Sequence, residues 1–180
     1  FDREISKKII DLANSYGIKT LVDPKPENFN FFKNCTVISP NEKEAEKITG
    51  MTYENGKKAL SKMGEILTEK SGAKYVVITC GRDGMFSYHN GDSMFVRTTA
   101  KEVFDVTGAG DTFSATLSLA LASGVDIHDA AVLANYAAGI VVGRVGTATV
   151  TIKEIRERME QAEQASVNLR KDSIRHRNIL

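Results

Sequence analysis

The sequence lacks tryptophan and has only two cysteines and three histidines among its 180 residues. These numbers exclude a disulfide framework and a Cys/His zinc cluster. A formal net charge of +1 provides no field for nucleic acid or an anionic membrane. No apolar run approaches about 18 uninterrupted residues, so we expect no transmembrane helix.

The amino-acid composition indicates a globular domain with a substantial core. Hydrophobic residues make up 42% of the chain, enough at this length to bury a core. Cys35 and Cys80 adjoin apolar, strand-like segments, and we expect them to be buried and reduced. Residues 1–4 show no signal-peptide pattern, which with the cysteine usage favours a cytoplasmic location.

The hydrophobic periodicity predicts an α/β fold. Strands alternating with helices favour a mostly parallel sheet with helices on its faces. Asn90-Gly91 between the last two strands predicts a hairpin at one edge. The expected helices are 1–16, 42–49, 56–70, 110–123, 127–142 and 152–165, and the expected strands are 19–22, 36–39, 75–79, 85–89 and 93–97.

The most informative motif is the run DVTGAGDTF at positions 105–113. It is a turn of small residues directly before an apolar helical stretch. The unpaired N–H groups of such a turn, together with the helix dipole, form an anion site suited to phosphate. Asp111 lies beside that site and is able to take a proton from a hydroxyl. The combination predicts transfer of a phosphoryl group to an alcohol.

Three other motifs are similar to this run. Gly108 and Gly110 form G-x-G, but the third small residue of a dinucleotide fingerprint falls on Phe113. A Walker A loop is excluded because G-x-x-x-x-G-K-[ST] occurs nowhere in the chain. A plain glycine-rich turn between strand and helix remains open on spacing alone.

The same run resembles the C-terminal signature of the PfkB, or ribokinase-like, carbohydrate kinases. The resemblance implies that Asp111 is the catalytic base and that the backbone of Gly108, Ala109 and Gly110 forms the anion hole for the γ-phosphate of ATP. It also implies a ribokinase-like three-layer sandwich, of which this chain is the C-terminal part. One departure is Thr116, where the family usually has a small residue; it affects helix packing rather than chemistry.

A second motif, NEKE at positions 41–44, resembles the N-x-x-E motif of the same family. The resemblance implies that Asn41 and Glu44 hold Mg²⁺ through its waters, and that Asn41 contacts the nucleotide. Residues three apart share one side of a helix, and Mg²⁺ keeps much of its hydration shell. The alternative is a helix cap with Asn41 first and Glu44 at the third helical position. Both functions are compatible.

A third motif, DPKP at positions 23–26, follows a strand-like segment. Asp23 stands where a parallel strand would end, and ligands of α/β sheets bind outside those ends. A D-P-K stretch occurs at this place in heptose-type members of the family, which implies that Lys25 contacts a nucleotide phosphate. The alternative is a surface loop punctuated by proline.

Two further motifs resemble nucleotide contacts of the family. TCGRDG at 79–84 is similar to its T-x-G-x-x-G turn and implies roles for Thr79 and Gly81; the alternative is a hairpin turn. The region 135–147 corresponds to its adenine pocket and implies roles for Asn135 and Gly146. The alternative there is a tightly packed helix of small residues.

The resemblance also sets an expected domain organisation. Residues 1–166 correspond to the C-terminal half of a kinase domain, and we expect a piece of a larger protein, since the chain opens inside a helix without methionine. Residues 167–180 are polar and basic and predict a solvated tail or interdomain linker.

Within the family, the motifs are most similar to the kinase domain of bifunctional ADP-heptose synthases. This implies phosphorylation of D-glycero-β-D-manno-heptose 7-phosphate at its anomeric hydroxyl, in ADP-heptose biosynthesis for lipopolysaccharide core. The implied cofactors are ATP and Mg²⁺. The implied partners are a sugar or sugar phosphate, a second copy of the intact protein and a downstream nucleotidyltransferase domain. Some relatives bind a monovalent cation near the position of Asp105, which this sequence does not decide.

Other functions remain open at this point. The substrate could be fructose, ribose or a nucleoside such as adenosine. The chain could instead be a catalytically silent nucleotide- or sugar-binding module, inactive as a fragment. The basic tail could dock a partner.

Overall fold

The computed structural model describes residues 2–53, 56–100 and 104–177, with side chains described as far as residue 165. Five strands form one sheet in the order β1-β2-β3-β4-β5. β1, β2 and β3 are parallel, whereas β3, β4 and β5 pair antiparallel, so the sheet is mixed. The strands are β1 Leu21–Val22, β2 Val37–Ile38, β3 Tyr75–Thr79, β4 Gly84–His89 and β5 Asp92–Arg97.

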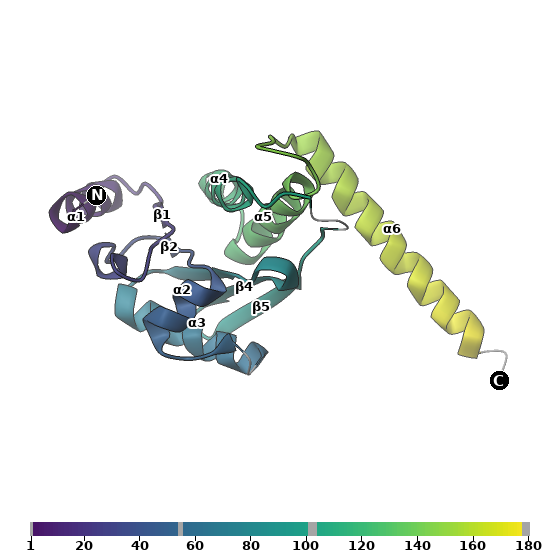
Figure 1. Ribbon diagram of the computed structural model, residues 1–180, viewed down its shortest axis with the longest axis horizontal. Coiled ribbons are helices and arrows are strands. Elements are labelled where there is room, and N and C mark those ends of the chain that lie inside the picture. Colours follow the sequence, from purple (N-terminus) through teal and green to yellow (C-terminus); the bar gives the residue numbers. More distant parts are fainter. Residues whose placement is uncertain (1, 54–55, 101–103, 178–180) are drawn as a thin grey trace.

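Helices cover both faces of the sheet and give three layers (Figure 1). On β3, Val76 and Ile78 pack into the core on one face, and Val77 packs into the core on the other, as strand alternation requires. The first core includes residues of α2 (Glu42–Thr49) and α3 (Lys57–Ser71). The second includes residues of α4 (Ala109–Ala122) and α5 (Ile127–Val141).

Two helices lie outside this central stack. α1 (Arg3–Ser15) contacts the short 3₁₀ helix η1 (Phe29–Phe31) beside β1. α6 (Ile152–Arg177) contacts α5 near its own start and then projects away from the sheet (Figure 1). A second 3₁₀ turn, η3 (Gly81–Asp83), leads from β3 into β4.

Most predicted elements are confirmed, with ends that differ by at most two residues. The first two strands are shorter than predicted, and just before them Thr20 and Thr36 exchange hydrogen bonds between backbone and side chain. Each backbone N–H donates to the other threonine's Oγ1, at 3.0 and 2.9 Å. The hairpin prediction is confirmed by the positive φ of both Asn90 and Gly91, as a type I′ turn requires. Phe1 lies outside the described residues.

The last helix was predicted to end at Ala165, but α6 continues to Arg177. No glycine or proline occurs after Gly146, so the sequence contains no strong terminator. The predicted boundary at residue 166 therefore falls inside one continuous helix, and a linker function for residues 167–180 stays a prediction.

Cys35 and Cys80 are buried and free, as predicted. Loss of solvent raises the pKa of each thiol to about 12, so both are neutral at physiological pH. Among the described helices, none has the length and apolar character needed to cross a membrane.

Gly84, at the start of β4, provides a test of the pairing between β4 and β5. Its φ is +123°, and an added Cβ would lie 2.0 Å from the Val96 carbonyl oxygen. Gly84→Ala is expected to lower the free energy of unfolding by about 3 kcal/mol or more, through backbone strain and overlap combined. Urea denaturation of the 180-residue chain measures this change.

Gly91→Ala is the matched control, since Gly91 also has a positive φ but an added Cβ meets nothing within 4 Å. This variant should lose only about 1–2 kcal/mol, the cost of the left-handed backbone. Equal losses in the two variants would contradict the predicted overlap at Gly84.

Candidate active site

The carboxyl ends of β1, β2 and β3 meet at one edge of the sheet, because these three strands are parallel. Asp23 follows β1, and Asn41 lies shortly after β2. Asn41 forms an isolated parallel bridge with Thr79 at the end of β3, and the Thr79 amide donates to the Pro40 carbonyl at 3.1 Å. Ligands of parallel α/β sheets bind at this edge.

Asn41 and Glu44 form a reciprocal capping box at the start of α2. The Glu44 amide donates to Asn41 Oδ1 at 3.0 Å, and the Asn41 amide donates to Glu44 Oε2 at 2.8 Å. The other carboxylate oxygen of the buried Glu44 pairs with Lys25 Nζ at 2.7 Å. The cap interpretation of this motif is therefore confirmed, and Glu44 also connects α2 to the loop after β1.

Three carboxylates and one lysine lie near the start of α2: Asp23, Glu44, Asp111 and Lys25. Loss of solvent raises the pKa of Asp23; the charge of Lys25 opposes this effect, and the charges of Glu44 and Asp111 reinforce it. The hydrogen bond to Glu44 raises the pKa of Lys25. Asp111, in the first turn of α4, is thus near enough to influence the carboxylate that follows β1. The structure therefore brings together the motifs at positions 23–26, 41–44 and 105–113.

The N-terminus of α4 is open. Gly108 occupies the N-cap position with φ +78°, and none of the described side chains caps the helix. Within the described part of the chain, the N–H groups of Gly108, Gly110 and Asp111 donate to no acceptor, whereas the Ala109 N–H donates to the Val106 carbonyl at 3.2 Å. Three free amides at the positive end of a helix dipole attract an anion.

The Asp105 carboxylate accepts hydrogen bonds that fix the loop before α4. Its Oδ1 accepts the Thr107 amide at 2.8 Å, and its Oδ2 accepts the Gly146 amide at 3.1 Å. The Phe104 amide also donates to the Val142 carbonyl at 2.8 Å. The loop before α4 is therefore joined to the loop after α5, and the predicted residue Gly146 serves as the attachment point.

A cavity of about 820 Å³ opens next to these elements. Six of the residues predicted from the sequence line it: Asn41, Thr79, Gly81, Ala109, Gly110 and Asn135. The largely buried Asn135 donates its Nδ2 to the Arg97 carbonyl at 2.8 Å, so this amide fixes the segment after β5. Gly139 allows that segment close approach, since an added Cβ would lie 2.5 Å from Thr99 Oγ1.

The other predicted residues do not line the cavity. Gly108 is the N-cap of α4, and Asp111 lies in the first turn of that helix. Lys25 and Glu44 pair with each other, and the Gly146 amide donates to Asp105 Oδ2.

Lys43 and Arg82 line the cavity but were not singled out from the sequence. Each occupies a variable position of a motif whose fixed residues were predicted. Both could have been found from the sequence as basic residues inside motifs that resemble nucleotide-binding motifs.

The described residues contain no group of three or more histidine, cysteine, aspartate or glutamate side chains able to hold a metal ion. Both oxygens of Glu44 already have protein partners. Asn41 and Glu44 therefore fit an ion held through its water molecules better than one coordinated directly.

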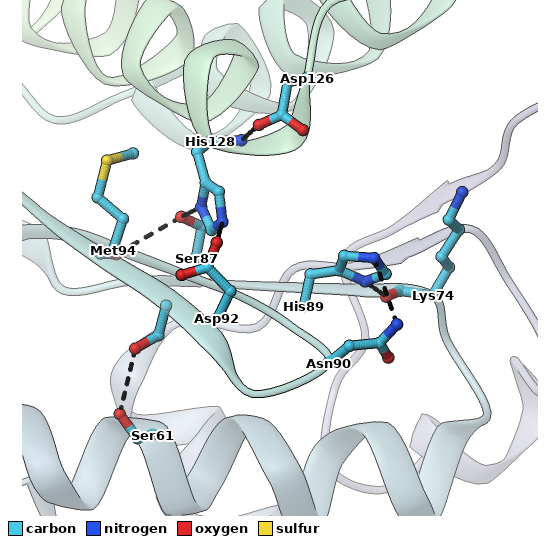
Figure 2. Close-up of polar contacts among 10 residues, drawn as sticks. Ser61, Lys74, Ser87, His89, Asn90, Asp92, Met94, Asp126 and His128 are labelled. Atoms are coloured by element: carbon cyan, nitrogen blue, oxygen red, sulfur yellow. Dashed lines mark hydrogen bonds and ion pairs between the residues drawn. The ribbon is translucent and has the colours of Figure 1, made fainter.

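A Ser–His–Asp arrangement occurs elsewhere, between α5 and the β4–β5 hairpin (Figure 2). Ser87 Oγ lies 2.7 Å from His128 Nδ1, and His128 Nε2 lies 3.3 Å from Asp92 Oδ2. Ser87 is 0% exposed, so no substrate reaches its hydroxyl. The arrangement joins the start of α5 to the sheet and is not a hydrolytic site.

The fold and the open helix terminus define an α/β protein of the class that binds ligands at the carboxyl ends of parallel strands. Residues 2–154 match the family model described as pfkB family carbohydrate kinase. The chain belongs to this family, and the family resemblance stated from the motifs is confirmed.

Relatives include two proteins named "Bifunctional protein HldE". The one from Alkalilimnicola ehrlichii is 40% identical over 160 residues, which are 88% of this chain and 33% of that protein. The one from Helicobacter hepaticus is 43% identical over 152 residues, which are 84% and 31%. The chain thus spans about a third of the length of the relatives it matches.

Solved structures confirm the ribokinase-like fold. Escherichia coli phosphofructokinase-2, in complex with substrates and products, aligns with a TM-score of 0.76 at 19% identity over 87% of this chain and 52% of that chain. Arabidopsis thaliana ribokinase, complexed with ribose and ATP, aligns with a TM-score of 0.75 at 24% identity, with the same two coverages.

The pKa of Asp105 provides a test of the joined loops. Hydrogen bonds from Thr107, and then from the Gly146 amide, lower this pKa from its ordinary value of 3.8. A lowered pKa means that the ionised form is stabilised, so the connection holds at neutral pH and is lost as the pH falls through a value below 3.8. NMR titration of the Asp105 carboxyl should show a midpoint below 3.8.

Asp105→Asn should also accelerate hydrogen exchange at the Gly146 amide, because an asparagine has one acceptor oxygen in place of two. Asp129→Asn, in the first turn of α5, should leave that exchange rate unchanged. An unchanged rate in Asp105→Asn would show that Asp105 does not hold the second loop.

Proposed function

We propose that the protein containing this chain is an ATP-dependent sugar kinase with Asp111 as its general base. The observation that carries the proposal is the open N-terminus of α4, with a carboxylate in its first turn, beside a cavity at the carboxyl edge of parallel strands. Membership of a carbohydrate kinase family supports the same reaction class.

ATP fits this site as the phosphoryl donor. The free N–H groups of Gly108, Gly110 and Asp111 are suited to the γ-phosphate oxygens. Lys43 and Arg82 add positive charge in the cavity. A cavity of about 820 Å³ has room for the rest of a nucleotide, with Thr79 and Gly81 along the phosphates and ribose and Asn135 near the base.

The proposed step is an in-line displacement. A sugar hydroxyl oxygen forms a bond to the γ-phosphorus while the bond from that phosphorus to the bridging oxygen of ADP breaks, and its electron pair leaves with ADP. Asp111 accepts the hydroxyl proton as the new bond develops. The amides at the start of α4 stabilise the charge on the transferring group without reorganising.

Mg²⁺, when bound, would neutralise charge on the phosphate oxygens. Asn41 lines the cavity, and Glu44 stands three residues further along the same helix. The side chains of both are suited to hydrogen bonds with the waters of the ion. Their mutual capping bonds hold them in place for this function.

For the acceptor, we propose D-glycero-β-D-manno-heptose 7-phosphate, phosphorylated at its anomeric hydroxyl. Relatives named HldE at 34–43% identity support this choice. The fold by itself does not choose among sugars, since the aligned structures include complexes with fructose-6-phosphate and with ribose.

The proposal extends to the parent protein. Its relatives are named bifunctional and are about three times as long as the matched segment, which supports a second domain, proposed to be a nucleotidyltransferase in ADP-heptose synthesis in the cytoplasm. A tetrameric form of phosphofructokinase-2 among the aligned structures supports a homo-oligomer.

Asp111→Asn in the full-length parent protein is expected to lower kcat by about 10²–10⁴-fold, because the amide cannot accept the hydroxyl proton. ATP affinity should change little, since the backbone amides remain. ADP release with Mg-ATP, assayed on heptose 7-phosphate, fructose, ribose and adenosine, measures turnover and identifies the acceptor.

Asp129→Asn is the matched control, an exposed aspartate in the first turn of the next helix, and should keep normal turnover. Near-normal turnover in Asp111→Asn would remove Asp111 from the reaction. Turnover with another sugar alone would retain the kinase and exclude the heptose substrate.

A further inference from the structure

One wall of the cavity is formed by residues 98–100, a segment that follows β5 and belongs to neither a helix nor a strand. Thr98 and Ala100 of this segment line the cavity. Two hydrogen bonds fix its start: the Thr98 amide donates to the Asp83 carbonyl at 3.2 Å, and Asn135 Nδ2 donates to the Arg97 carbonyl at 2.8 Å. Because the segment lies outside the sheet, bonds from other elements determine its position.

A further bond to the 98–100 segment comes from α6. Arg158 Nη2 donates to the Thr99 carbonyl at 2.6 Å, and both residues are partly buried. The side chain of Thr99 adds no bond, since its buried Oγ1 has no hydrogen-bond partner among the described residues. The guanidinium stays charged at physiological pH, and a charged donor makes one of the stronger kinds of hydrogen bond. The middle of this wall is therefore held through its backbone, from α6.

The start of α6 is itself anchored, so that Arg158 is presented from a defined place. Ile155, three residues earlier on the same side of the helix, is 9% exposed. Glu154 accepts the Thr151 amide at 2.7 Å and pairs with Arg144 in the loop after α5. Hydrogen bonds from Thr151, and then from Arg144, lower the pKa of Glu154 to about 2. The first turns of α6 are thus joined to the end of α5 before the helix projects away (Figure 1).

We propose that Arg158 is a positioning residue for the nucleotide, which holds the 98–100 segment where the nucleoside end of ATP contacts it. The inference rests on the proposed function, which puts the base near Asn135, and Asn135 bonds to the start of the same segment. Arg158 does not line the cavity, so it acts through the Thr99 backbone rather than by touching the nucleotide. It also lies beyond the match to the family model, which ends at residue 154.

The place of Arg158 separates nucleotide binding from phosphoryl transfer. Asp111 and the free amides at the start of α4 belong to a different element, whose loop Asp105 fixes. Loss of the Arg158 bond should therefore weaken the fit of the nucleoside and leave the transfer step intact. An interaction that serves the ground state and the transition state equally is seen in KM and not in kcat.

Steady-state kinetics of the full-length parent protein test this separation. In Arg158→Ala, the KM for Mg-ATP should rise about five- to tenfold while kcat stays within about twofold and the KM for the sugar is unchanged. Arg158→Lys keeps a cationic donor and should recover part of the loss. Arg156→Ala is the matched control, an exposed arginine two residues earlier on the same helix, and should behave as the wild type. Circular dichroism melting checks that the variants remain folded.

Hydrogen exchange tests the wall without any nucleotide. In Arg158→Ala of the same parent protein, a peptide that covers residues 98–100 should exchange faster by mass spectrometry, because the bond to the middle of the segment is lost. The same peptide in Arg156→Ala should exchange as in the wild type, and so should a peptide from the β4–β5 turn in both variants.

Three results would overturn the positioning role: an unchanged KM for Mg-ATP in Arg158→Ala, an equal rise in Arg156→Ala, or unchanged exchange of residues 98–100 in Arg158→Ala. Failure of the proposed function looks different. If the wild type releases no ADP with any acceptor, the kinase activity and the nucleotide as occupant are both excluded, while the exchange measurement still decides whether Arg158 holds this wall.

Discussion

The candidate site depends on the hydrogen bonds by which the Asp105 carboxylate joins the loop before α4 to the loop after α5. Amides that are to bind a phosphate cannot also hold their own loop in place. Asp105 resolves this conflict by accepting the Thr107 and Gly146 amides, while the amides of Gly108, Gly110 and Asp111 have no acceptor among the described residues. The free donors are thus fixed before any ligand arrives, as preorganised electrostatic stabilisation requires.

Glu44 plays the corresponding role on the other side of the site. It caps α2 through Asn41 and holds Lys25 by an ion pair. The loops after β1 and β2 are therefore connected through Glu44, and substitution of Glu44 would affect the cap, the lysine and any water-mediated ion at once. A structural interpretation and a functional interpretation of the N-x-x-E motif do not exclude each other here, because each carboxylate oxygen can accept a second hydrogen bond beside the one from its protein partner.

The sequence predicted the order of elements, helices on both faces of the sheet and six of the residues that line the cavity, because small-residue turns and apolar strand ends are local signals. It could not predict which side of α1 is buried, since Ile5, Ile9 and Leu12 have the spacing of a core-facing side and yet are exposed. It missed the full length of α6, where a polar segment without glycine or proline continues an existing helix. The bond from Asp105 to Gly146 joins positions 41 residues apart, which no local pattern indicates.

The most direct test of the central claim, that the start of α4 is a phosphate site, is an NMR titration of the ¹⁵N-labelled 180-residue chain with Mg-ATP. The account predicts that the largest amide shifts occur at Gly108, Gly110 and Asp111, with smaller shifts at Thr79 and Gly81 across the cavity. Saturable binding that leaves the amides of Gly108, Gly110 and Asp111 unshifted would contradict it.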